Sequence, residues 1–211
     1  RFVRVVSDTF PGRVVCIGLQ GSRGRGEAAP DSDIDMVVIL DRLDYQDLAR
    51  YQSLVDTLPQ RELLCGFLSG REELERWDPA ELFQFYYDTR PLVGGLEFLQ
   101  EKFDREDVAR AVRNGACAIY HACVHNSLYE RDRAALSALY KTAVFTLQAK
   151  YYQETGWYVS RHRALLEKLS GGDREILARA LAVRAGNEPD LEEDGARLFQ
   201  WSGELIRGID S

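Results

Sequence analysis

The sequence predicts an α+β fold, in which a small mixed sheet is followed by an α-helical bundle. Two patterns predict it: β-branched and apolar runs are confined to the first third of the chain, and helical spacing continues from about residue 104 onward. Apolar residues make up 45% and charged residues 29% of the 211 residues, as in ordinary globular proteins. We therefore expect two domains, residues 1–103 and 104–211.

Three strands and two helices are expected in the first domain. Arg13–Leu19 (RVVCIGL) is β-branched and apolar, and Ile34–Leu40 (IDMVVIL) begins with alternation and ends as a buried run. The segment Glu62–Leu68 (ELLCGFL) predicts a third strand. Apolar residues at helical spacing predict a helix over Leu43–Thr57, and Pro79 suits the first turn of another helix.

The second domain is expected to consist of roughly five helices. Asp104 is a candidate cap for a helix over Val108–Leu128, and a long helix over Ala134–Thr155 should stop at Gly156. Turns that contain glycine separate three shorter helices, expected near Ser160–Leu169, Asp173–Val183 and Leu191–Ile206.

Composition and charge exclude several classes of protein. No apolar run approaches the roughly 18 residues that a membrane span needs, and the first residues, RFVRVVSDTF, lack the shape of a signal peptide. The net charge of −7 argues against a general affinity for nucleic acid, because that affinity comes from Lys and Arg neutralising phosphates. The four cysteines form no CxxC pair, which indicates reduced, buried thiols and a cytoplasmic location.

The stretch GLQGSRGRGEAAPDSDIDMVVIL, residues 18–40, joins the first two expected strands and carries the chemistry. Gly21 permits a sharp turn, and Ser22 adds a hydroxyl beside exposed backbone N–H groups, an arrangement that can cradle phosphate oxygens. Arg23 and Arg25 offer fork-shaped donors to the same anion. This turn is therefore a candidate phosphate site, with Arg23 as an additional contact.

Two aspartates follow this turn at the start of the second expected strand. Asp33 and Asp35 flank Ile34, and residues i and i+2 of a strand point to the same face. Adjacent carboxylates repel unless a cation lies between them, and Mg²⁺ prefers carboxylate oxygens together with substrate phosphates. The pair therefore predicts bound Mg²⁺, with ATP or another nucleoside triphosphate as co-substrate.

Gly-Ser, ten intervening residues and then DxD resemble the signature of the minimal nucleotidyltransferases of the DNA polymerase β-like superfamily, the kanamycin nucleotidyltransferase group. The resemblance covers about Phe2–Leu68. It implies that Gly21 and Ser22 bind the triphosphate and that Asp33 and Asp35 bind the metal. The helical half resembles, less specifically, a HEPN domain, the bundle that often accompanies this unit.

The same family often carries a third catalytic carboxylate on the next strand. Here Glu62 is the only acid of that segment, at its start, and is our candidate for the third catalytic residue beside the two aspartates. Three other sources stay open: Asp88, Glu97 or a second subunit of a homodimer.

Other residues of the helical half admit weaker functional interpretations. Cys117, His121 and His125 share one helix face and could bind zinc, although a half-buried helix face with hydrogen-bonded histidines is the commoner explanation of such spacing. Arg113 with His121 resembles the ribonuclease pair of some HEPN domains, but the spacing is slightly long. The aromatic run LFQFYYDT, residues 82–89, suits either a core or an acceptor pocket.

The resemblance implies two alternative functions. The first is transfer of a nucleoside monophosphate, with AMP from ATP expected, to a hydroxyl of a small molecule such as an aminoglycoside, of a protein or of an RNA end. The second is a nucleotide-binding regulatory module with little turnover, of the kind found in toxin–antitoxin pairs. The absent acid in the middle of the third strand favours the second, and the intact Gly-Ser and DxD favour the first.

Overall fold

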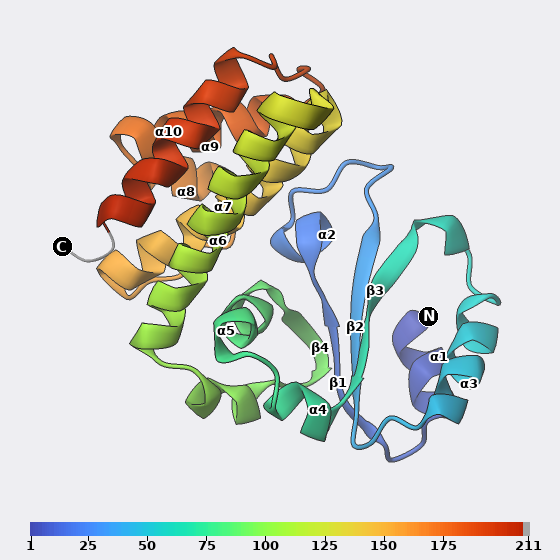
Figure 1. Cartoon of the computed structure of the whole chain (residues 1–211). Helices are drawn as coiled ribbons and strands as arrows, with labels where there is room; N and C mark the ends of the chain where they lie inside the picture. The colour runs from blue at the N-terminus through green and yellow to red at the C-terminus, as the bar shows by residue number, and fades with distance from the viewer. Residues whose placement is uncertain (209–211) are drawn as a thin grey trace. The chain divides into compact units, whose positions relative to one another are not determined.

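The computed structural model describes residues 1–208 and consists of two compact units, Arg1–Asp104 and the residues from Arg105 onward. Figure 1 shows the first unit as a sheet with helices and the second as helices. The predicted α+β class, with a mixed sheet followed by a helical bundle, is confirmed.

The described part of the first unit contains one four-stranded sheet in the order β3-β2-β1-β4. Its strands are β1 (Val14–Leu19), β2 (Ile34–Leu40), β3 (Leu64–Gly70) and β4 (Arg90–Gly94). β1 lies antiparallel to both β2 and β4, whereas β2 and β3 are parallel. The end of β1 and the start of β2 therefore meet at one edge of the sheet, where the connection between them carries the Gly-Ser turn.

Helices cover both faces of this sheet (Figure 1). On one face, α1 (Phe2–Thr9) and α3 (Tyr45–Val55) pack against a cluster that includes Val38 and Leu40 of β2. The other face is covered from the segments α4 (Arg71–Glu75), α5 (Pro79–Asp88) and the 3₁₀ helix η2 (Glu97–Lys102). Burial of each large apolar side chain contributes roughly 1.5–3 kcal/mol to folding, so both faces fix the strands that carry the aspartates.

Short helical turns precede β2 and β3. α2 (Gly21–Arg25) follows β1 directly, and the 3₁₀ helix η1 (Arg61–Leu63) precedes β3. The prediction that the third strand begins at Glu62 was wrong, because Gln60 adopts a left-handed backbone and Leu63 N donates to its carbonyl oxygen. Glu62 therefore lies in a turn before the strand.

The helices of the second unit, as far as it is described, enclose a core of their own. They are α6 (Arg105–His125), the π-helical turn η3 (Asn126–Glu130), α7 (Arg133–Thr155), α8 (His162–Lys168), α9 (Gly171–Arg184) and α10 (Glu193–Gly208). Tyr140 and Leu147 of α7 and Trp201 of α10 are buried in that core. α7 ends where Gly156 takes a left-handed conformation, as the sequence predicts.

The predictions about the cysteines are confirmed only in part. All four cysteines are free thiols, but Cys65 and Cys117 are exposed, so the prediction of buried thiols is wrong for these two. Cys65 lies on an edge strand, which leaves one side of its backbone open to solvent. Among the described helices, none has the length and apolar character that crossing a membrane requires.

Candidate active site

Asp33 and Asp35 lie where β2 begins. Asp35 is the second residue of the strand and half-buried, and Asp33 is exposed just before it. Alternation along β2 places Asp35 on the same face as Val37 and Ile39, the face that α5 covers. Within residues 1–208, neither carboxylate accepts a hydrogen bond or forms an ion pair, so no side chain of the fold occupies their oxygens.

The Gly21 turn lies directly against Asp35. Gly21 has a φ of +64°, and a Cβ placed on it would come within 2.0 Å of Asp35 Oδ2. The backbone is fixed there as well, because Gln20 N donates to the Asp35 carbonyl oxygen at 2.8 Å. Only glycine fits this contact, so the turn that carries Ser22 and the metal-binding candidate are held together.

Arg23 forms hydrogen bonds with the loop that connects the turn to the aspartates. Its guanidinium donates to the backbone carbonyl oxygens of Pro30, Ser32 and Asp33 at 2.8–3.2 Å. These bonds hold the chain in place as it enters β2. The predicted phosphate contact of Arg23 stays a prediction, and any such contact would have to share the guanidinium with these carbonyl oxygens.

The candidate third carboxylate lies at the same edge of the sheet. Glu62 is exposed in η1, two residues before Leu64, which pairs with Ile34 across the parallel ladder. The register then pairs Asp35 with Cys65, so the β3 position beside Asp35 carries a thiol. Glu62 as a catalytic residue stays a prediction, one that depends on a turn and not on the strand.

Asp88, another acid that the sequence left open, lies beside this turn at the end of α5. Its Oδ1 accepts from Arg25 Nη1 at 2.9 Å, and its Oδ2 accepts from Gly21 N at 3.4 Å. Burial raises the pKa of the Asp88 carboxyl and Arg25 opposes this shift, while the charge of Asp35 adds to it. Asp88 is therefore near Asp35, but its charge is matched by Arg25.

No cluster of three or more metal ligands (His, Cys, Asp or Glu side chains) is assembled in residues 1–208, either at the aspartates or on the helical face with the histidines. His121 and His125 have ring centroids 6.4 Å apart, and His125 Nδ1 lies 3.5 Å from Glu130 Oε1. The structure therefore gives the Cys117, His121 and His125 face no zinc-binding arrangement.

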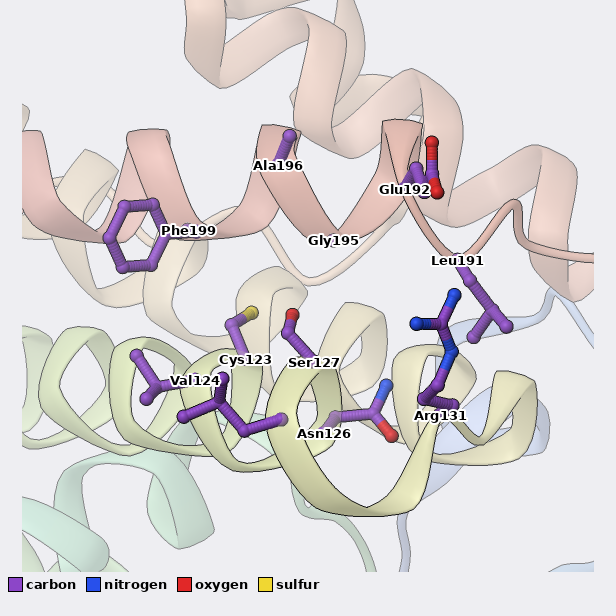
Figure 2. Close-up of a pocket in the computed structure, with 11 residues that line it drawn as sticks. Cys123, Val124, Asn126, Ser127, Arg131, Leu191, Glu192, Gly195, Ala196 and Phe199 are labelled. Carbon is purple, nitrogen blue, oxygen red and sulfur yellow. The ribbon is translucent and has the colours of Figure 1, made fainter.

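A cavity of about 470 Å³ opens within the helical unit, between the α6–η3 segment and α10. In Figure 2, Phe199 lies at one end of it and Arg131 with Glu192 at the other, while Ser127 points toward Gly195. None of the predicted site residues lines this cavity. It has the size of a small-molecule pocket, but it belongs to a different unit from the aspartates.

Comparison with known proteins defines the class. Residues 1–86 match the family model of the nucleotidyltransferase domain. Those residues include the Gly21 turn, both aspartates and Glu62, and they are a nucleotidyltransferase domain. The protein is thus an enzyme of the transferase class, one that transfers nucleoside monophosphate groups.

A solved structure shows the fold of the whole chain. Spectinomycin adenyltransferase AAD(9) from Enterococcus faecialis, crystallised with ATP and spectinomycin, is 13% identical to this chain with a TM-score of 0.59. The similarity covers 100% of this chain and 98% of that one, so both the sheet unit and the helical unit share its fold. No curated protein sequence matches the chain. The HEPN-like character of the second unit stays a prediction.

Sequence reasoning missed the residues that hold the turn. Arg25, Asp88 and Thr89 contact the Gly21 turn or each other, yet 63 residues separate Arg25 from Asp88. The sequence offered Arg25 as a phosphate donor and Asp88 as one of several acids of unknown position, but it did not pair the two. A buried arginine near a phosphate-type turn could have suggested a partner, but spacing alone cannot say which acid it is.

Proposed function

We propose that the protein transfers a nucleoside monophosphate, AMP from ATP, to a hydroxyl group of a small molecule in a reaction that depends on Mg²⁺. One observation carries the proposal: the carboxylates of Asp33 and Asp35 have no hydrogen-bond or ion-pair partner within residues 1–208, and Asp35 lies against the Gly21 turn. Carboxylates that no basic group of the fold neutralises, beside a glycine turn, suit a cation with a triphosphate.

The residues at this edge fit Mg²⁺. Asp33 and Asp35 supply the hard oxygen donors that Mg²⁺ takes from proteins, and the absence of a Cβ at Gly21 lets Asp35 Oδ2 lie against the turn that would bind the triphosphate. A third protein ligand is not required, because Mg²⁺ keeps waters and binds substrate phosphates in such sites. When bound, the ion would offset negative charge on the phosphate groups.

The chain's own residues would bind and orient the reactants. The backbone N–H groups and the hydroxyl at Gly21 and Ser22 would hold the triphosphate tail so that the α-phosphorus faces the acceptor. The acceptor oxygen forms a bond to that phosphorus as the bond to the bridging oxygen breaks, and pyrophosphate leaves. Glu62 is the candidate to take the hydroxyl proton.

The acceptor is proposed from the likeness of the whole fold. Both units of this chain are matched by an enzyme that was solved with ATP and spectinomycin, a small molecule with several hydroxyl groups. A small hydroxylated acceptor, with aminoglycosides and related aminocyclitols as the first class to test, is therefore preferred over a protein or an RNA end. The net charge of −7 also argues against an RNA acceptor.

Pyrophosphate release is the direct test. Purified protein would be incubated with Mg²⁺ and each of the four nucleoside triphosphates over a panel of aminoglycosides and aminocyclitols, and the products analysed by mass. The proposal predicts release that depends on both acceptor and Mg²⁺, with an adduct 329 Da heavier when AMP is transferred, roughly the mass of an added adenylyl group. Loss of activity in Asp35→Asn, with folding retained, assigns the reaction to this site.

A second function is favoured by one observation. The β3 position beside Asp35 is Cys65, and β3 (LCGFLSG) contains no acid. A site of this kind would bind the nucleotide and turn it over slowly, as a regulatory module of the toxin–antitoxin type would. Calorimetric binding of Mg²⁺-ATP without pyrophosphate release over the whole panel would favour this alternative.

A further inference from the structure

We propose that the end of α5, Asp88 with Thr89, is a positioning element of the nucleotide site that holds the Gly21 turn against Asp35. The inference rests on the proposed function, because it assigns to that turn the binding of the triphosphate. Asp88 and Thr89 are positioning residues and not catalytic ones, since they act through the turn.

Two side chains at the end of α5 form hydrogen bonds with two successive residues at the start of the turn, Gln20 and Gly21. Thr89 Oγ1 accepts a hydrogen bond from Gln20 Nε2 at 2.7 Å and donates its own proton to the Phe85 carbonyl oxygen at 2.6 Å. Asp88 Oδ2 accepts from Gly21 N at 3.4 Å. The hydroxyl of Thr89 is therefore fixed by its helix and cannot rotate away from Gln20.

The far end of the turn is held by the same helix end. Arg25, the last residue of α2, donates from Nη1 to Asp88 Oδ1 at 2.9 Å. The side chains of Arg25 and Asp88 are 7% and 10% exposed, so the pair is shielded from solvent, where an ion pair is strong and costly to break. A second carboxylate, Glu27, lies 3.7 Å from Arg25 Nε.

These contacts are arranged around the proposed ligand site. Gln20 is bonded on one side to Asp35 through the backbone and on the other to Thr89 through its side chain. The distance between the Gly21 turn and the Asp35 carboxylate is thereby set from two sides. A phosphate bound to the turn and a cation bound to Asp35 need that distance to be fixed, so loosening α5 should weaken both.

The first test removes the Thr89 link without changing its shape. Thr89→Val replaces the hydroxyl with a methyl group, whereas Thr89→Ser keeps the hydroxyl and loses the methyl group. Hydrogen exchange of the amides in residues 20–26, without nucleotide, and calorimetric binding of Mg²⁺-ATP are measured for both. We expect faster exchange in that segment and about tenfold weaker binding in Thr89→Val, as one lost hydrogen bond gives, and values close to wild type in Thr89→Ser.

The second test removes the charges of the buried pair. Arg25→Gln combined with Asp88→Asn leaves two amides that can still bond each other, so neither member of this pair stays behind as a buried charge without the other, although the Glu27 contact with Arg25 is also lost. We again expect faster exchange in residues 20–26 and weaker Mg²⁺-ATP binding. Should this double variant fail to fold, the threonine pair of variants decides the matter alone.

A matched ion pair serves as the control. Asp47→Asn breaks the Arg13–Asp47 pair, which has a 2.9 Å contact and lies in the same unit at the opposite end of β1 and β2. This variant should leave exchange in residues 20–26 and Mg²⁺-ATP binding unchanged. Unchanged exchange in Thr89→Val, or equal exchange changes in Thr89→Val and Asp47→Asn, overturns the proposal.

Failure of the proposed function looks different. If wild-type protein binds no Mg²⁺-nucleotide, the assignment of the site fails, and the exchange data still decide whether α5 holds the turn. Suppose instead that wild type binds Mg²⁺-ATP, and that Thr89→Val has faster amide exchange in residues 20–26 but unchanged affinity. Then α5 holds the turn without contributing to nucleotide binding, and the positioning proposal is wrong.

Discussion

The aspartates at the two ends of the β1–β2 pair differ in whether a basic side chain pairs with them. At the end where β1 starts and β2 stops, Arg13 donates to Asp41 at 3.1 Å and to both oxygens of Asp47 at 2.9 and 3.1 Å. At the other end, Asp33 and Asp35 carry the same charge with no partner in the described chain. Paired charges stabilise the fold at one end, and the aspartate carboxylates at the other end have no partner in the described chain, which is why we propose them as ligands of a metal ion.

The two ends differ in what their aspartates contribute to the stability of the fold. A pair such as Arg13–Asp47 also caps α3, since the Asp47 side chain accepts from Asp44 N at 3.0 Å. Within residues 1–208, the side chains of Asp33 and Asp35 make no such contact, so the fold gains no ion pair and no helix cap from them. Residues that the fold does not need and that lie together beside a glycine turn are best explained by function.

The largest effect is expected from neutralising the unmatched pair. Asp33→Asn with Asp35→Asn should lower pyrophosphate release by about a thousandfold, because metal-assisted charge stabilisation contributes several kcal/mol to such transition states. The thermal midpoint should stay level, since these side chains form no ion pair or hydrogen bond that the substitutions would remove. If the thermal midpoint of the double variant falls together with its activity, the two acids contribute to the stability of the fold.

Glu62 provides the next largest expected effect. If Glu62 takes the acceptor proton, Glu62→Gln should lower turnover by about a hundredfold, the lower end of general base catalysis, with nucleotide affinity unchanged. The control is Cys65→Ala, which changes the residue that pairs with Asp35 without removing an acid. Wild-type turnover in Glu62→Gln would remove Glu62 from the site.

Gly21 tests how closely the turn must approach Asp35. In Gly21→Ala the added Cβ would meet Asp35 Oδ2 at 2.0 Å, at a φ of +64° that alanine rarely adopts. We expect a loss of activity of about tenfold to a hundredfold, as small misplacements of reacting groups cause, and a stability loss of roughly 1–3 kcal/mol. Urea unfolding and initial rates measure the two; an active alanine variant with wild-type stability contradicts the contact.

The smallest expected effect is on the stability of the protein at acid pH, through the Arg13–Asp47 pair. Hydrogen bonding to Arg13 lowers the pKa of Asp47 to about 2. The folded-state pKa is below the unfolded value of about 3.9, so this stabilisation is present above that value and is lost as the pH falls toward 2. Asp47→Asn should flatten the dependence of the unfolding midpoint on pH between about 4 and 2 and leave activity at neutral pH intact. Parallel pH profiles for wild type and variant would contradict this.

Local patterns made much of this structure predictable. The spacing from Ser22 to Asp35 and the apolar runs around it indicated two strands joined by a turn, and Ile34–Leu40 is a strand over the predicted residues. Helical spacing and Gly156 likewise indicated the long helix of the second unit. These signals lie within one element or one turn, where neighbouring residues decide the backbone.

Contacts between distant segments were beyond such patterns. β4 (RPLVG) is a short exposed edge strand with a proline and no alternation, so only its pairing with β1 defines it. α1 is rich in valine, which indicates a strand locally, and becomes a helix that buries Val6 against the sheet. The Arg25–Asp88 pair depends on where α5 ends in space, which the spacing of residues does not specify.

Calorimetric titration of Mg²⁺-ATP into three proteins, wild type, Asp33→Asn with Asp35→Asn, and Asp47→Asn, tests the central claim most directly. The account predicts metal-dependent binding in wild type and in Asp47→Asn, and none in the double variant. Equal binding in all three proteins, or binding in wild type that does not require a divalent ion, would contradict the assignment of the unpaired aspartates to a metal–nucleotide site.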